Sequence, residues 1–357
     1  MGSHFFTGFP GFVATEMIQQ LFKQGITKEV YAVVLLEELA GAKAAVQLIE
    51  RQFEGCQIVL FEGDITLPNL DIADRELAII QSNVEVVWHL AVLQDLSVKR
   101  EHAWRVNVHG TVNVNDFVCH LPNLRRYMYF SSTFIAGKRT GKVLEMELIR
   151  PDEFHNYLEE TKFESELLVD DLKLDVPTTI IRPSMIYGHS VTGSTKRFDG
   201  IYYMLKGISF FNSRRVIPKI GSKEPLHVVS IDYVVQASIA LSELSDAEGE
   251  TVHIMDRKQY DVLSIYLEMV KLMTGKSTFG RLPLGIAKAM LEQPTVHERL
   301  RIPPQFIDYL DYAAEFDTKD CEALLASIEL PASDLMHSLP EIIYFYEENK
   351  HLQSFYR

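Results

Sequence analysis

Cysteine is scarce in this chain of 357 residues, and its few cysteines lie far apart. Cys56, Cys119 and Cys321 form no C-x-x-C pair, so no disulfide framework is expected and a reducing compartment, the cytoplasm, is predicted. The 12 histidines are scattered without the spacing of metal ligands, and no metal site is predicted.

Positive charge and long apolar runs are also in short supply. The chain has 35 Lys+Arg against 49 Asp+Glu, and its formal net charge of −14 argues against nucleic acid or an anionic membrane as a partner. No apolar run approaches the ~18 residues needed to cross a bilayer, so stable membrane insertion is not expected. A strand-like pattern begins at Ser3, which leaves no room before it for a signal peptide and again favours the cytoplasm.

What the sequence does have is an alternation of short apolar runs with longer helical patterns. Its composition, 47% hydrophobic and 24% charged, is that of a globular protein. Nearly continuous apolar strands joined by helices predict an α/β fold, a Rossmann-like doubly wound parallel sheet with its ligand site at the carboxyl ends of the strands. The predicted strands are HFFTG (4–8), VYAVVLL (30–36), QIVLFEGD (57–64), VEVVWHLA (84–91), RYMYFSS (126–132), TTIIRPS (178–184) and the segment containing GETVHIMD (248–256).

The pattern changes after Gly188. IYYMLKGISFF (201–211) reads as a helix, LHVVSIDYVVQASIALSELS (226–245) as a strand followed by a helix, and the chain from about residue 259 onward as mostly helical. The sequence therefore predicts a Rossmann-like domain made of residues 1–188 and 227–258. It predicts a smaller, mostly helical C-terminal substrate domain made of residues 189–226 and 259–357.

The segment TGFPGFVA fits the pattern G-x-x-G-x-x-G/A between a predicted strand and a predicted helix. Gly8 makes the tight turn, Gly11 lets backbone N–H groups approach a pyrophosphate, and Ala14 allows close packing of helix on sheet. This context favours dinucleotide binding over a plain turn. The expected contacts of the cofactor are Gly8, Phe9, Pro10, Gly11, Phe12 and Val13.

Polar and small residues follow the next predicted strands. Asp64 is placed to hydrogen-bond an adenine amino group while Ile65 packs on the ring, although an Asp that caps the following segment explains the residue equally well. Leu90 and the small Ala91 are expected to let the ribose–nicotinamide half lie close to the backbone. His89 is interpreted as buried structure and not as a catalyst.

The fifth predicted strand ends in FSSTFIAG. Ser132 and Thr133 are placed there to hydrogen-bond a substrate carbonyl, although Ser and Thr at such positions usually cap turns or helices.

Taken in order, TGFPGFVA, GDI, HLA, VNVHGT, SST…G, NYLEETKFESE, RPSMIYG and VVSIDYVV resemble the extended short-chain dehydrogenase/reductase superfamily, which includes NAD-dependent epimerases and dehydratases. The resemblance covers roughly residues 4–260. RPSMIYG with the following TG, and VSIDYVV, most resemble the thioester-reductase and fatty-acyl-CoA-reductase (male sterility) branch.

The resemblance implies a set of roles. A Tyr hydroxyl protonates the carbonyl oxygen as hydride arrives, and a Lys four residues later, here Lys162, binds the ribose hydroxyls and lowers the pKa of the Tyr. Ser132, with Thr133 next in line, polarises the carbonyl. Asn107 organises the active-site helix, and Pro183 lies near the nicotinamide.

The tyrosine itself is out of register. Asn156 and Lys162 fix the pattern N-x-Y-x-x-T-K, and its tyrosine position falls on Leu158. Tyr157 is one residue away, which is ~100° around a helix. Tyr157 can serve only if the first turn of the helix is rewound by one residue. Otherwise turnover should be slow, because the loss of a general acid typically costs ~10²–10⁴ in rate.

Coenzyme choice rests on conflicting signals. Glu37 or Glu38, after the second strand, would bond the 2′-OH of NAD and repel the 2′-phosphate of NADP, although both also suit the start of a helix. The resembled branch usually uses NADPH through an Arg near this point, where this chain has Leu35 or Leu36, and Lys43 is a distant substitute. The resemblance favours NADP, with NAD as the alternative.

These observations predict an NAD(P)-dependent oxidoreductase that transfers hydride to a small-molecule carbonyl or acyl-thioester substrate. An acyl chain or aldehyde suits the apolar IYYMLKGISFF. One alternative is a sugar-nucleotide epimerase or dehydratase, with Lys196 and Arg197 clamping a diphosphate. Another is a catalytically dead NAD(P)-binding regulatory protein. Assembly as a homodimer is left open.

Overall fold

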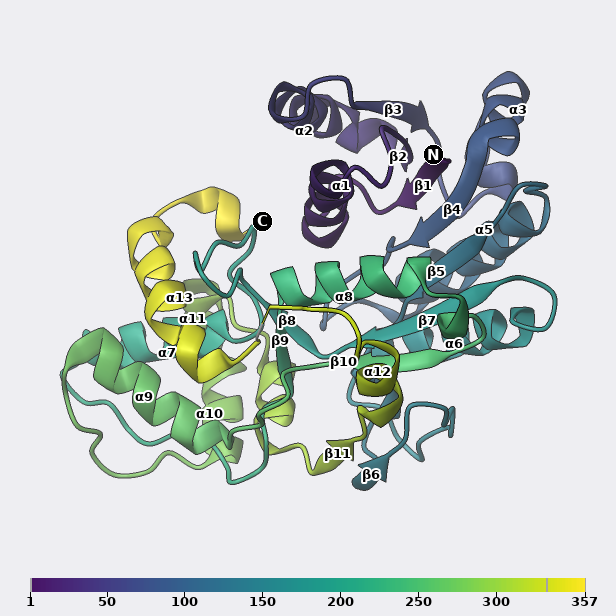
Figure 1. The fold of residues 1–357 in the computed structure, drawn as a ribbon. Coiled ribbons are helices and arrows are strands. Elements are labelled where there is room, and N and C mark those ends of the chain that lie inside the picture. Colours follow the sequence, from purple (N-terminus) through teal and green to yellow (C-terminus); the bar gives the residue numbers. More distant parts are fainter. Residues whose placement is uncertain (1, 332, 357) are drawn as a thin grey trace.

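The computed structural model describes residues 2–331 and 333–356, and within them seven strands form one parallel sheet (Figure 1). The strand order is β10-β7-β5-β4-β1-β2-β3. Each strand overlaps one of the runs predicted from the sequence, so the Rossmann-like doubly wound fold is confirmed. The order reverses between β1 and β4, and the ligand crevice of such folds lies at the carboxyl ends of these strands. The strands are β1 (Ser3–Thr7), β2 (Glu29–Val34), β3 (Gln57–Glu62), β4 (Val84–His89), β5 (Arg126–Phe130), β7 (Thr178–Pro183) and β10 (Thr251–Ile254).

Each face of the sheet has its own apolar core, because successive residues of a strand point to opposite faces. Phe6 belongs to the core that packs under α1, α2 and α8, whereas its neighbour Phe5 belongs to the core under α3, α5 and α6. These helices are α1 (Phe12–Gln24), α2 (Leu39–Gln52), α8 (Ile231–Glu243), α3 (Asp74–Asn83), α5 (Gly110–Cys119) and α6 (Tyr157–Leu172).

A further apolar core lies beside the sheet, among the green and yellow helices at the left of Figure 1. The helix predicted at 201–211 is confirmed as α7, and the helical reading of the chain beyond residue 259 is also confirmed. The elements of this core are α7 (Tyr202–Asn212), α9 (Val262–Thr274), α10 (Leu284–Leu291), α11 (Pro294–Leu300), η6 (Pro304–Asp311) and α13 (Leu335–Asn349).

The C-terminal third also returns to the sheet. Cys321 of α12 (Lys319–Leu324) packs in the same core as α1 and α8. The buried Glu145 carboxylate accepts backbone N–H groups from His253, Asp320 and Cys321, and burial raises its pKa to about 7. Residues distant in sequence are therefore joined at the β10 edge.

Short elements connect the larger ones. β8 (Met185–Tyr187) pairs with β9 (Val228–Ser230), and β6 (Gly141–Val143) pairs with β11 (Ala314–Phe316). Among residues 2–331 and 333–356, no helix has the length and apolarity needed to span a membrane. The remaining turns and helices are η1 (Leu36–Glu38), η2 (Pro68–Asp71), α4 (Arg100–Ala103), η3 (Trp104–His109), η4 (Thr133–Ala136), η5 (Ser245–Ala247) and η7 (Gln353–Tyr356).

Candidate active site

The glycine-rich turn joins β1 to α1 as the sequence predicted. Gly8 has a φ of +85°, and a Cβ built there would lie 2.8 Å from the backbone N of Ala91. The N–H of Gly11 donates to the Gly8 carbonyl at 2.8 Å, and a Cβ on Gly11 would lie 2.6 Å from the same oxygen. Both positions therefore require glycine, and the turn leads directly into the N-terminus of α1, where orphan N–H groups face an anion.

The end of β4 is fastened to this turn by Thr7. Its hydroxyl oxygen accepts the N–H groups of Leu90 at 3.1 Å and Ala91 at 3.0 Å. The same hydroxyl contacts Nδ1 of His89 at 2.8 Å, and Nε2 of His89 lies 3.1 Å from the Thr111 hydroxyl. Burial lowers the pKa of His89 to about 3, so the ring is neutral at ordinary pH. These contacts give His89 a structural place between β1 and α5.

Asp64 and Ile65 lie just beyond β3. The Asp64 carboxylate accepts the N–H of Thr66 at 2.8 Å, which is the capping role left open by the sequence. The side chain of Ile65 packs on Gly110, where a Cβ would come within 2.8 Å of the Ile65 Cδ1 atom. The GDI and VNVHGT motifs are therefore in contact.

Asn107 connects the loop after β4 with α6. Its Oδ1 accepts the N–H of Leu93 at 2.9 Å, and its Nδ2 donates to the Thr161 hydroxyl at 2.9 Å. Its backbone carbonyl accepts the Ser165 hydroxyl at 2.7 Å. The residue sits in the π-helical turn η3, a geometry that is frequent at functional sites. These contacts tie Asn107 to α6 and to the loop after β4.

Lys162 points from α6 to the carboxyl end of β5. Its ammonium donates to the carbonyl of Phe130 and lies 5.0 Å from the centre of the Tyr129 ring. The residue is 8% exposed, and burial lowers the pKa of Lys162 to about 8, while the negative charge of Glu166 opposes this shift.

Hydroxyl groups follow the carboxyl ends of β5 and β7, and Lys162 reaches the end of β5. Among residues 2–331 and 333–356, the hydroxyl oxygens of Ser131, Thr133 and Ser184 are buried and have no hydrogen-bond partner. Such atoms call for a partner, such as a ligand or water. The Ser132 hydroxyl instead accepts the N–H of Phe134 at 3.2 Å. Pro183 is the last residue of β7, directly before Ser184.

Ser131 and Ser184 were not singled out from the sequence. The signal was nevertheless present, because each lies at the carboxyl end of a predicted apolar strand, in FSS and in RPS.

The first turn of α6 is regular from Tyr157 onward. Asn156 caps it, with its side-chain oxygen accepting the N–H of Glu159 at 3.1 Å. In this geometry Leu158, four residues before Lys162, lies ~40° from it around the helix, whereas Tyr157 lies ~140° away. Tyr157 is 46% exposed and borders an open cavity of about 610 Å³. Leu158 is half-buried.

The first turn of α6 is also held by a residue from the C-terminal third. The Tyr309 hydroxyl donates to the Glu159 carboxylate at 2.6 Å and accepts from Asn156 Nδ2 at 2.8 Å. Glu159 also accepts the backbone N–H of His155 at 2.8 Å. Sequence analysis missed this cluster, because no periodicity or motif links residues so far apart.

A separate apolar cavity of about 70 Å³ lies in the core beside the sheet. It is enclosed mainly by α7, α10 and η6. Gln305 of the same η6 segment borders the open cavity beside Tyr157, so η6 lies between the two spaces. The lining residues are Tyr203, Met204, Gly207, Phe210, Phe211, Ile220, Tyr266, Leu282, Ala287, Met290, Leu291, Val296, Leu300, Ile302, Phe306, Ile307 and Leu310.

Comparison with known proteins now identifies the family. A model of an NAD-binding family described as male sterility protein matches residues 6–238, which is more than half of the chain. The chain belongs to the male sterility protein family. The resemblance to the thioester-reductase and fatty-acyl-CoA-reductase branch of the extended short-chain dehydrogenase/reductase superfamily is thereby confirmed.

A relative with a reductase name is consistent with this family. The fatty acyl-CoA reductase wat of Drosophila melanogaster is 26% identical over 278 residues, covering 66% of this chain and 53% of the relative. The chain therefore spans about half the length of that relative.

Solved structures share the fold. The terminal R domain from the myxalamid PKS-NRPS biosynthetic pathway has a TM-score of 0.81 at 18% identity, covering 99% of this chain and 92% of that one. UDP-glucuronic acid 4-epimerase from Bacillus cereus, in complex with NAD, has a TM-score of 0.69 at 18% identity, covering 98% of each chain.

A nicotinamide dinucleotide fits the residues of this chain. The glycine-rich turn offers backbone N–H groups to a pyrophosphate, and the buried Lys162 and Thr133 supply polar groups beyond it. In the described part of the chain, no group of three or more His, Cys, Asp or Glu side chains is arranged to hold a metal ion.

Proposed function

We propose that this chain is an NAD(P)-dependent oxidoreductase that reduces the carbonyl group of an acyl thioester or an aldehyde. The observation that carries the proposal is the buried Lys162, whose ammonium bonds the Phe130 carbonyl at the end of β5, in a sheet where buried, unpartnered hydroxyls of Thr133 and Ser184 follow β5 and β7. These groups stand at the carboxyl ends of β5 and β7, in the same parallel sheet as the glycine-rich turn. The names of the reductases to which the chain is similar support the same chemistry.

The proposed roles follow from position and charge. The bound coenzyme supplies the hydride. Lys162 binds the ribose hydroxyls, and its positive charge stabilises the oxyanion that develops on the substrate. Thr133, with Ser132 beside it, donates a hydrogen bond to the substrate carbonyl. Asn107 holds α6 so that Lys162 stays at the end of β5.

Proton delivery is the weak step of the proposed reaction. Leu158 occupies the position from which a tyrosine would donate a proton, and a hydrocarbon side chain has none to give. The proton must then come from Lys162 or from water, and we propose slow turnover as the consequence.

We propose that the core beside the sheet forms the substrate-binding domain and that its apolar cavity takes the acyl chain. The enclosed volume of about 70 Å³ is below that of a ligand pocket, so the aromatic and aliphatic lining has to part to admit the chain. Because η6 lines both this cavity and the open space at Tyr157, a chain that enters the cavity from that space must pass η6.

For the coenzyme we propose NADP, on the basis of the resembled branch. The physical argument from Glu37 and Glu38 favours NAD, because both are exposed directly after β2 and a carboxylate there repels a 2′-phosphate. The experiment below includes both coenzymes for this reason.

Fluorescence titration of the purified chain with NADPH and with NADH tests the proposal. We expect saturable binding, tighter for NADPH, followed by slow coenzyme oxidation when a long-chain aldehyde or acyl-CoA is added. Absence of binding to either coenzyme would refute the whole proposal. Tighter binding of NADH would refute only the coenzyme assignment.

A second candidate function is a catalytically silent dinucleotide-binding protein. The regular first turn of α6, with Leu158 on the face of Lys162, favours it. Tight coenzyme binding without reduction of any aldehyde or thioester, even in a single-turnover experiment at high protein concentration, would establish this second function over the first.

A further inference from the structure

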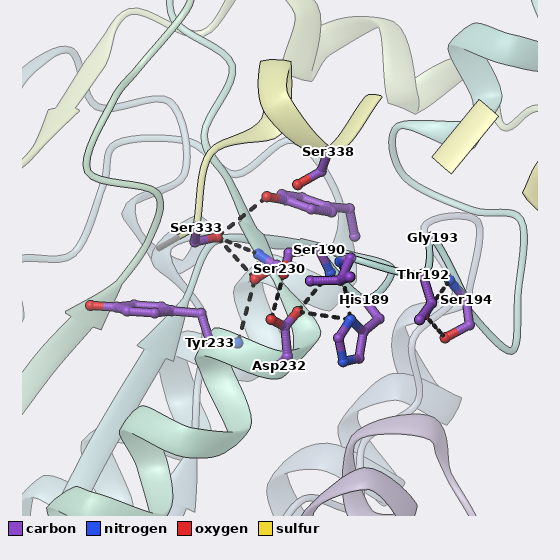
Figure 2. Close-up of polar contacts among 12 residues, drawn as sticks. His189, Ser190, Thr192, Gly193, Ser194, Ser230, Asp232, Tyr233, Ser333 and Ser338 are labelled. Atoms are coloured by element: carbon purple, nitrogen blue, oxygen red, sulfur yellow. Dashed lines mark hydrogen bonds and ion pairs between the residues drawn. The ribbon is translucent and has the colours of Figure 1, made fainter. Parts of the chain in front are cut away.

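The loop that follows β8, residues 189–197, is fastened to the first turn of α8. Figure 2 shows Asp232 facing the loop, where its carboxylate accepts the N–H of Ser190 at 2.8 Å and the Ser190 hydroxyl at 2.6 Å. Nδ1 of His189 lies 3.9 Å from the same carboxylate. The start of the loop is therefore tied to a helix that packs against α1.

The middle of the loop is closed on itself and against α13. The N–H of Gly193 donates to the carbonyl of His189 at 2.8 Å, and the N–H of His189 donates to the carbonyl of Ser194 at 2.9 Å. Gly193 has a φ of +66°, and a Cβ there would lie 2.2 Å from the carbonyl oxygen of Glu341. The loop thus has a defined path between α8 and α13.

That path delivers Lys196 to the glycine-rich turn. Its ammonium donates to the Thr15 hydroxyl at 2.8 Å and to the carbonyl of Pro10 at 3.2 Å. Pro10 lies within the turn, and Thr15 lies in the first turn of α1. The positive charge therefore stands at the helix N-terminus where a Rossmann fold binds the pyrophosphate.

The neighbouring charges make this position significant. Glu16 follows Thr15 on α1, burial raises its pKa, and the positive charge of Lys196 opposes that rise. A carboxylate near the head of α1 would repel a diphosphate. Lys196 offsets this charge and offers its own N–H donors.

We propose that Lys196 binds the pyrophosphate of the dinucleotide, supplied across the crevice by the 189–197 loop. The inference rests on the proposed dinucleotide binding and adds a residue outside the glycine-rich turn. In the complex, a phosphate oxygen accepts the N–H groups of the Lys196 ammonium, which in this structure donate to Thr15 and Pro10. Because both coenzymes share the diphosphate, Lys196 contributes equally to binding of NADPH and NADH.

The neighbouring cation provides a matched control. Arg197 is exposed and pairs with Asp199 at 3.4 Å, so Arg197→Met removes the same formal charge one residue away. Lys196→Met keeps the length of the side chain and removes the ammonium, and Lys196→Arg keeps a charged donor. Thermal melting of each variant without coenzyme checks that the fold is intact.

The measurement is the Kd for NADH and for NADPH, by fluorescence titration at low and at moderate salt. We expect Lys196→Met to raise both Kd values by roughly ten- to a hundredfold and to weaken their salt dependence, because a hydrogen bond between charged groups is lost. Lys196→Arg should recover most of the affinity, and Arg197→Met should change both Kd values by less than about twofold, since surface charges are screened.

Each other outcome has a distinct meaning. If the wild-type chain binds coenzyme and Lys196→Met binds it as tightly as Arg197→Met does, the inference is wrong while the proposed function stands. If only NADPH binding is weakened, Lys196 contacts the 2′-phosphate and the pyrophosphate assignment is overturned. If the wild-type chain binds neither coenzyme, the proposed function itself fails. Should Lys196→Met melt early, the same comparison is made with Lys196→Gln.

Discussion

Replacement of Leu158 by tyrosine should turn slow turnover into efficient reduction. Leu158 lies in the first turn of α6, on the face that carries Lys162, and it is half-buried. A tyrosine there is four residues before the buried ammonium, whose positive charge lowers the pKa of a nearby phenol. A positioned general acid contributes ~10²–10⁴ in rate, which corresponds to about 2.7–5.4 kcal/mol of the activation barrier.

The assay is coenzyme oxidation with a long-chain aldehyde, in steady state and in a single turnover. Leu158→Phe is the matched control, because it adds the same ring without the hydroxyl. We expect Leu158→Tyr to raise kcat by ~10²-fold or more and Leu158→Phe to leave it unchanged. Tyr157→Phe should also have little effect, since that side chain is exposed on another face of the helix.

Two results would refute this reasoning. The first is no gain in Leu158→Tyr although the variant binds coenzyme and melts as the wild type does. The second is loss of activity in Tyr157→Phe, which would make Tyr157 the acid and would require the first turn of α6 to rewind in the bound state.

Further predictions concern charge, stability and chain length. Burial lowers the pKa of Lys162 to about 8, so its ammonium is charged below pH ~8. We expect kcat/KM to fall about tenfold per pH unit above that value. Lys162→Met should remove the activity at every pH, whereas the control variant Lys173→Met should retain it. Gly207 lines the apolar cavity with open space around a built Cβ, so Gly207→Leu should shift preference to shorter acyl chains, whereas Gly285→Leu on α10 should not. The free energy of unfolding, measured with urea, should decrease as the pH falls below ~6.5. Each histidine that stays neutral in the fold should contribute about 1.4 kcal/mol per pH unit, because the same histidine binds a proton in the unfolded state. The raised pKa values of Glu145 and Asp256, both about 7, act in the opposite direction and reduce the slope. The histidines concerned are those whose pKa burial lowers to about 3 or 4: His4, His89, His227 and His253. Substitution of one of them by Gln should make the free energy of unfolding depend less steeply on pH. An unchanged dependence would refute the claim that this histidine is neutral in the fold.

The sheet and the glycine-rich turn were accessible from the sequence because both are local patterns. A continuous apolar run such as VYAVVLL predicts a buried strand by itself, and the glycines of TGFPGFVA predict a tight turn. The contact between Tyr309 and Asn156 could not be predicted from the sequence, because the two residues are 153 positions apart and no motif or spacing links them. The same is true of Lys196 and Thr15, which are 181 residues apart.

The candidate site has the hydrogen bonds that hold Asn107 and Lys162 in place, but it has no tyrosine at position 158, where the proton donor is expected. The hydrogen bonds of Asn107 and Lys162 do not involve a tyrosine at position 158: Asn107 bonds Leu93 and Thr161, and Lys162 bonds Phe130. The coenzyme-binding scaffold that we propose therefore does not depend on a tyrosine at position 158. In the proposed reaction, Leu158 slows proton delivery and leaves the binding surface intact. We therefore expect nucleotide binding and turnover to be separable, and a variant at position 158 should change the second without the first.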